Sequence, residues 1–129
     1  MTRFRLIAPA IVALLASATL PHGAAADPQG QVAAGGALFK QRCAACHSVT
    51  SGQKGIIAPN LAGVVGRKAA SADFAYSPAL KASGLTWSTA NLDRFLAAPM
   101  KLVPGTRMVV AIADPADRAN VIAWLATRH

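Results

Sequence analysis

Glutamate is absent from this chain of 129 residues, and five aspartates face thirteen lysines and arginines. The formal net charge is +8, which favours encounter with acidic surfaces. Aromatic residues are also scarce, at 5% of the chain. The basic residues are dispersed, with no run and no interleaved aromatics. This pattern argues against nucleic acid as the partner, because such proteins gather their basic residues into patches.

A hydrophobic run long enough to span a membrane comfortably is also lacking. The most apolar stretch, residues 6–20, is short and follows a basic opening with Arg3 and Arg5. Three alanines at 24–26 close the segment, so we interpret residues 1–26 as a signal peptide. A retained N-terminal membrane anchor is the alternative.

Export leaves residues 27–129 as the mature chain, which we expect to form one domain. Without Arg3 and Arg5 this part carries eleven basic residues against five aspartates, a formal charge of +6. A signal peptide implies an oxidising compartment, such as a bacterial periplasm.

Helical spacing dominates the mature chain, and no strand pattern or internal repeat competes with it. The sequence therefore predicts an all-α fold of about four short helices. Most of them start at Ser or Asp followed by proline or by apolar residues at helical spacing. The expected helices cover residues 29–45, 78–82, 89–97 and 115–127, and residues 48–72 and 101–108 are expected to be loops.

Two glycines, Gly35 and Gly36, lie inside the first expected helix, where glycine lowers helix stability. A close backbone approach by another element is the expected compensation. The predicted loops are also long for a compact core of this size. We therefore expect a bound group to organise them.

The clearest motif is Cys43-Ala44-Ala45-Cys46-His47, the pattern of covalent c-type haem attachment. Residues three apart lie on one face of a helix, so both thiols can reach the two vinyl groups along one porphyrin edge. His47 follows where the helix turns, and its imidazole can meet the iron from the proximal side. The motif predicts one covalently bound haem c.

Three other interpretations of the two cysteines have less support. A thioredoxin-like dithiol needs a βαβ framework that the sequence does not predict. Half of a zinc site needs two further Cys or His ligands, and only His129 remains in the mature chain. A disulfide alone would leave His47 unexplained.

An electron-carrying haem usually takes a sixth ligand, for which the mature chain offers Met100, Met108 and His129. Met108 is the best placed, because it ends a loop with Pro104-Gly105 that can hold a thioether over the distal face. A methionine is more often core filling than a ligand, so the residues alone leave both roles of Met108 open.

The residues around these motifs resemble class I cytochrome c of the mitochondrial and bacterial c2 type, over nearly all of the mature chain. The resemblance covers the family's first helix, proximal loop, distal half and last helix. The matching positions are Gly35, Phe39, Pro59-Asn60-Leu61, Gly63, Arg67, Trp87, Pro99, Pro104-Gly105-Thr106-Arg107-Met108 and Val121-Ile122-Ala123-Trp124-Leu125.

This resemblance implies roles for several positions. Met108 would be the sixth ligand opposite His47, and the carbonyl of Pro59 would accept a hydrogen bond from the His47 ring. Tyr76 and Trp87 would donate hydrogen bonds to a haem propionate. Plain core packing is the alternative for both aromatic residues.

The resemblance also implies that Arg67 lies close to the same propionate and offsets its charge, where a solvated surface charge is the alternative. Gly35 would let the first and last helices cross closely beside Phe39 and Trp124.

The chain departs from the mitochondrial pattern in the distal pocket. Phe95 stands where those relatives have a tyrosine that bonds the methionine sulfur, and Leu80 stands where they have an asparagine. Val110 replaces a phenylalanine at the exposed edge. Thr106 alone remains of that polar network, so we expect a drier pocket around Met108.

Together these features predict a monomeric, monohaem electron carrier, not an enzyme, that shuttles single electrons between redox proteins of a periplasmic respiratory or related chain. Stable membrane insertion is not expected after signal cleavage. Acidic partner surfaces would dock on cations around the exposed haem edge. These cations are Arg42, Lys54, Lys101 and Arg107.

Two alternatives to a free carrier stay open at this point. The haem domain could be a fixed subunit of a larger dehydrogenase or oxidase. A labile Met108 would instead open the iron and favour a haem peroxidase or a gas-binding protein.

Overall fold

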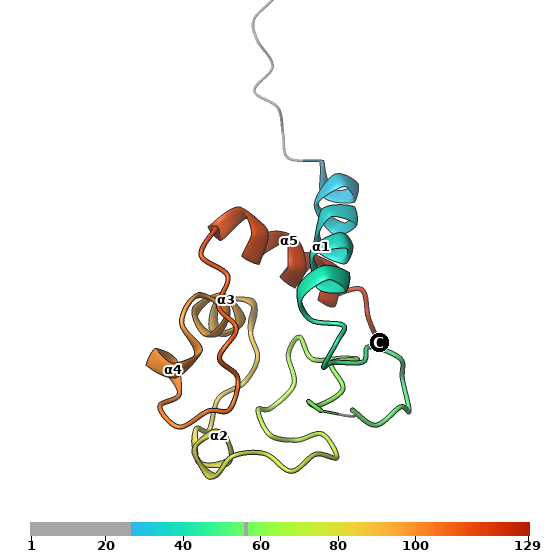
Figure 1. The fold of residues 1–129 in the computed structure, drawn as a ribbon. Helices are drawn as coiled ribbons and strands as arrows, with labels where there is room; N and C mark the ends of the chain where they lie inside the picture. The colour runs from blue at the N-terminus through green and yellow to red at the C-terminus, as the bar shows by residue number, and fades with distance from the viewer. Residues whose placement is uncertain (1–26, 56) are drawn as a thin grey trace, which may run out of the picture.

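The computed structural model describes residues 27–55 and 57–129, and the expected signal peptide lies outside these residues. Helices dominate the described part, where an isolated bridge between Lys68 and Thr86 is the one strand-like feature. The predicted all-α fold is confirmed. The helices are α1 (Pro28–Arg42), α2 (Pro78–Ala82), α3 (Thr89–Ala97), α4 (Pro99–Leu102) and α5 (Pro115–Leu125) (Figure 1).

Side-chain caps fix the start of every helix except α4. The carboxylates of Asp27 and Asp114 accept backbone N–H bonds in the first turns of α1 and α5. The hydroxyls of Ser77 and Ser88 do the same for α2 and α3. Each such cap is worth about 1 kcal/mol, and these starts follow the sequence prediction.

Other helix boundaries differ from the prediction. The first helix ends at Arg42 rather than at residue 45, and the amides of Cys46 and His47 both donate to the carbonyl of Cys43 in a tight turn. The last helix ends at Leu125 rather than at residue 127. A short helix, α4, occupies part of the segment expected to be a loop, because Pro99 both ends α3 and suits the first turn of a new helix.

Helices α1 and α5 cross closely at Gly35 (Figure 1). A Cβ atom at Gly35 would overlap the backbone carbonyl of Asn120, and one at Gly36 would lie 2.6 Å from the indole nitrogen of Trp124. The rings of Phe39 and Trp124 pack beside the crossing, with centroids 4.6 Å apart. The expected compensation for glycine inside the helix is thus a close backbone contact.

The helix-free segment 43–77 forms the side of the molecule opposite α3 and α4, below the α1–α5 pair (Figure 1). The segment that runs from α4 to α5 passes between these two halves in the same view. None of the helices in the described ranges has the length and hydropathy that crossing a membrane requires.

Candidate functional site

A cavity of about 350 Å³ lies between the segment 43–77 and the distal half of the chain. Much of its wall is hydrophobic and is shared with the protein core, for example at Leu92, Phe95 and Leu125. All nine site residues expected from the sequence line it: Cys43, Cys46, His47, Pro59, Arg67, Tyr76, Trp87, Thr106 and Met108.

His47 is held by the loop that follows it. Its Nδ1 lies 2.7 Å from the carbonyl oxygen of Pro59, and since a carbonyl can only accept, Nδ1–H is the donor. Burial lowers the pKa of His47 because it disfavours the charged ring, and the bond to Pro59 acts in the opposite direction. The neutral imidazole then presents the lone pair of Nε2 to a metal.

The two cysteines lie at the turn after α1, Cys43 half-buried and Cys46 exposed. Burial raises the pKa of Cys43, the charge of Arg42 lowers it, and the neighbouring Cys46 raises it. Before any thioether forms, the Cys43 sulfur is therefore a protonated thiol at neutral pH. The structure contains no disulfide between them, so both sulfurs can form thioethers.

Arg67 brings a positive charge to the cavity wall. Its two terminal nitrogens donate to the carbonyls of Ala62 and Asn60, at 2.7 and 2.9 Å. Its Nε is buried and has no hydrogen-bond partner within the described residues. A buried N–H without a partner is costly, so this atom fits an anionic group in the cavity, such as a propionate.

Tyr76 and Trp87 are buried on the same wall, 8% and 7% exposed. Burial raises the pKa of Tyr76, although a backbone hydrogen bond with Ala72 and the charge of Arg67 act to lower it. The phenol therefore stays protonated and can donate a hydrogen bond to a carboxylate. The indole N–H of Trp87 is also a donor only.

The distal wall contains Met108 and Thr106. Thr106 is buried, and its hydroxyl oxygen accepts a long hydrogen bond of 3.4 Å from the amide of Met108. Phe95 and Leu80 line the cavity too, and both present hydrocarbon. Met100, in contrast, is 50% exposed on α4 and does not line the cavity.

Residues 32–129 match the cytochrome c family. This chain is a member of that family. It is 46% identical to the cytochrome c2 of Rhodomicrobium vannielii over 122 residues, which cover 93% of this chain and 97% of the relative. It is also 46% identical to the cytochrome c of Theileria annulata over 99 residues, 76% of this chain and 86% of that one.

A solved structure agrees with these sequence matches. The cytochrome cH from Methylobacterium extorquens superposes with a TM-score of 0.69 at 46% identity, over 74% of this chain and 97% of that one. The predicted class I cytochrome c fold is confirmed. As a cytochrome c, the protein is an electron carrier with one covalently bound haem c, and the Cys43–His47 motif indicates where the haem is attached.

Zinc has no support as the alternative occupant of this cytochrome c site. Across residues 27–55 and 57–129, no three side chains of His, Cys, Asp or Glu gather where they could hold a metal ion. The two cysteines and His47 fall short of a zinc ligand set.

Sequence reasoning missed how the proximal loop of this cytochrome c is held. The side-chain amide of Asn60 donates to the carbonyls of Thr50 and Gln53, at 2.7 and 2.6 Å. Phe74 also lines the cavity and packs edge-on against Tyr76, with ring centroids 5.3 Å apart. The segment has no periodic pattern, so the position of Asn60 in the family resemblance was the one available signal.

The four cations expected around the haem edge are not equivalent. Arg42 and Arg107 line the cavity, and their guanidinium groups donate to the carbonyls of Ala111 and Ala75, at 3.2 and 2.8 Å. Lys54 and Lys101 do not line it. Each arginine therefore has a structural contact in addition to its charge.

Lys54 forms an ion pair of 2.7 Å with Asp73. Each partner holds the pKa of the other in its charged range, raised for Lys54 and lowered for Asp73. Both side chains are exposed, so the pair contributes little to stability. Asp73 also cancels most of the positive field of Lys54, whereas Lys101 is exposed on α4.

Proposed function

We propose that this cytochrome c is an exported carrier that moves single electrons between redox proteins of a periplasmic respiratory or related chain, with His47 and Met108 as its axial ligands. The observation that supports it is the shared cavity: His47 and Met108 line it together with both cysteines, and Met100 lies outside. With His47 and Met108 both bound to it, the iron would offer no position to a substrate. Methionine ligation keeps the potential high.

Each residue of this site has a task in that proposal. Haem c supplies the one-electron couple of its iron. Pro59 orients the His47 ring and raises its basicity. Tyr76 and Trp87 would donate hydrogen bonds to a propionate, and Arg67 would offset its charge.

The apolar wall would exclude water from the iron and keep its surroundings similar in the two oxidation states. A dry and rigid site needs little rearrangement when an electron arrives or leaves, which suits a carrier rather than an enzyme.

Export is the second part of the proposal. Residues 1–26 have the basic start, apolar middle and small-residue end of a signal peptide. The match with the Rhodomicrobium vannielii cytochrome c2 spans 122 residues, which is more than the segment 27–129 contains. The match therefore extends into the N-terminal segment. N-terminal sequencing of the exported protein tests the boundary, and a start at Asp27 is the expected result.

The absorption spectrum of the ferric protein tests the ligand assignment. A free carrier with His47 and Met108 on the iron should be low-spin and six-coordinate, with a methionine-to-iron band. A high-spin spectrum would instead favour the peroxidase or gas-binding alternative. Elution as a larger complex in native size-exclusion chromatography would favour the fixed-subunit alternative.

Electron transfer to an acidic partner should slow as ionic strength rises, because screening shortens to about 10 Å at 0.1 M salt. Lys101→Glu should mimic added salt and flatten the salt dependence. Stopped-flow rates measured over a salt series check both statements. Charge reversal at Arg107 is a poorer test, because it also removes the bond to Ala75.

A charge series provides the control for Lys101. Lys101→Gln removes one unit of charge where Lys101→Glu changes two, so it should give about half the effect on the logarithm of the rate at low salt. The rates of all variants should converge at high salt. Electron-transfer rates that change neither with salt concentration nor with substitution of Lys101 would contradict electrostatic docking at this edge.

The dry distal wall leads to a prediction for Phe95. Phe95→Tyr should lower the reduction potential by an amount worth about 1 kcal/mol, the scale of one net hydrogen bond, because a polar group in an otherwise dry pocket stabilises the extra positive charge of ferric iron. It should also shift the pH at which Met108 leaves the ferric iron. Redox and pH titrations measure the two effects. If neither quantity moves, Phe95 does not face the iron.

A further inference from the structure

The chain that follows Met108 has little burial of its own. Val109 is 76% exposed and Val110 is 40% exposed. The next buried residue is Ile112, which is 1% exposed. The downstream end of the Met108 loop is therefore anchored at Ile112, next to Ala111, whose carbonyl accepts the hydrogen bond from Arg42. The contacts of Ile112 help to limit how far Met108 can move.

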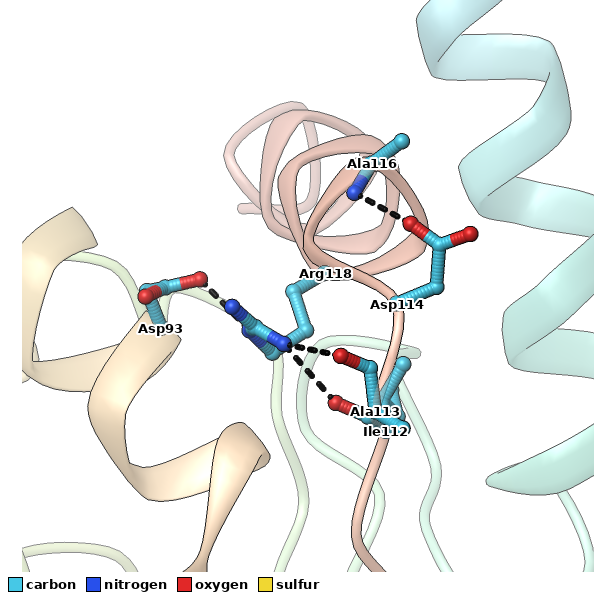
Figure 2. A network of polar contacts seen from close by, with 6 residues as sticks. All are labelled: Asp93, Ile112, Ala113, Asp114, Ala116 and Arg118. Carbon is cyan, nitrogen blue, oxygen red and sulfur yellow. Dashed lines mark hydrogen bonds and ion pairs between the residues drawn. The ribbon is translucent and has the colours of Figure 1, made fainter.

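Arg118 of α5 holds the backbone at this anchor (Figure 2). Its Nη1 donates to the carbonyls of Ile112 and Ala113, at 3.0 and 2.8 Å. Its Nε donates to the carboxylate of Asp93 on α3, at 2.7 Å. The Arg118 side chain is only 12% exposed, so these charged hydrogen bonds are poorly screened.

Helix α3 also binds the backbone of Ile112 directly. The amide of Ile112 donates to the carbonyl of Leu96, at 2.8 Å, and Leu96 lies three residues after Asp93. The ring of contacts thus runs from Arg118 to Asp93, along α3 to Leu96, and through Ile112 back to Arg118. Figure 2 shows Arg118 between Asp93 on one side and the 112–113 backbone on the other.

We propose that Arg118, oriented by Asp93, is a positioning residue that keeps Met108 at the iron. It locks residues 112–113 between α3 and α5, so that the exposed residues 109–111 cannot swing outward and carry Met108 with them. This inference rests on the proposed role of Met108 as axial ligand. Asp93 is 44% exposed, so its charge matters less than the bonds to the two carbonyls, and the effect of changing it should be smaller.

Amide hydrogen exchange tests the local lock. In Arg118→Gln, exchange of the Ile112 amide should accelerate about tenfold, the usual scale of a lost hydrogen bond to a charged group. The Cys43 amide, which bonds to Phe39 at the end of α1, should accelerate much less. Equal acceleration at both sites would mean that Arg118 only supports the fold as a whole, and would overturn the proposal.

Binding of imidazole to the ferric iron tests the consequence for Met108. Imidazole must displace Met108, so its apparent Kd is inversely proportional to the fraction of molecules in which Met108 has left the iron. Arg118→Gln should therefore bind imidazole about tenfold more tightly, the change that follows from the same lost hydrogen bond. Asp93→Asn should show a smaller gain.

Asp73→Asn is the matched control for Asp93→Asn, because it removes the same negative charge from the Lys54–Asp73 ion pair, whose contact does not involve residues 109 to 113. Its imidazole affinity should equal that of the unaltered protein. An equal gain in Asp73→Asn, or no gain in Arg118→Gln, would overturn the positioning role. Should Arg118→Gln fail to fold, Arg118→Lys retains the charge with fewer donors and should give an intermediate gain.

A reference variant separates this proposal from the assignment of the ligand. Met108→Ala should bind imidazole far more tightly than any Arg118 variant. If it does not, Met108 is not the ligand and the proposed function fails. If Met108→Ala binds tightly and Arg118→Gln is unchanged, only the positioning role is wrong.

Discussion

Replacing Cys43 and Cys46 together by alanine should leave no haem on the chain after denaturing electrophoresis. The two cysteines are three residues apart in the turn that follows α1 and line the cavity beside His47, so each can form one thioether to a vinyl group of the haem. Without either bond only the axial ligands and packing would hold the haem, and denaturant removes both. Haem staining of the gel, with the protein visualised separately, measures the loss.

The single variants are the controls for this experiment. Cys43→Ala and Cys46→Ala each keep one sulfur, so a weaker covalent haem stain should remain in both. Covalent haem in the double variant would show that attachment does not occur at these two cysteines.

Met108→Ala should abolish the methionine-to-iron band completely and lower the reduction potential. As the proposed sixth ligand, the thioether of Met108 would stabilise ferrous iron, and a water or hydroxide in its place would favour the ferric state. Absorption spectroscopy of the ferric protein and a redox titration measure the two effects.

Met100→Leu is the matched control, because it removes the other thioether of residues 27–129 from the exposed surface of α4. Both the band and the potential should stay as they are in the unaltered protein. The reverse pattern, with the band lost in the Met100 variant, would reassign the sixth ligand.

Local signals in the sequence were sufficient for most of the helices. The caps at Asp27, Ser77, Ser88 and Asp114 act within three residues, and such short-range chemistry is readable without a structure. The helix α4 was missed because a proline such as Pro99 is compatible both with the end of one helix and with the first turn of another.

The candidate site was also predictable, because its residues belong to motifs. The Cys43–His47 spacing indicated the haem, and the family resemblance supplied Pro59, Arg67 and Met108, all of which line one cavity. Neither source could indicate how the cavity wall closes, since residues such as Phe74 lie in a segment without any periodic pattern.

Long-range contacts between a side chain and a backbone carbonyl could not be predicted. In the sequence, Arg42 and Arg107 each belong to a set of dispersed basic residues. In the structure Arg107 bonds to Ala75, 32 positions away, and Arg42 bonds to Ala111, 69 positions away. A carbonyl acceptor can belong to any residue, so the sequence has no pattern that marks such a pair.

The bonds of Arg42 and Arg107 to backbone carbonyls also matter for the entropy of docking. A free arginine loses side-chain rotamer freedom when a partner immobilises it, at a cost of about 0.5 to 1.5 kcal/mol. Here much of that freedom is lost when the chain folds, before any partner arrives. An acidic partner that docked at this edge, as proposed, would meet two guanidinium charges in fixed positions. The encounter would then order few flexible groups that must be released again after the electron has passed.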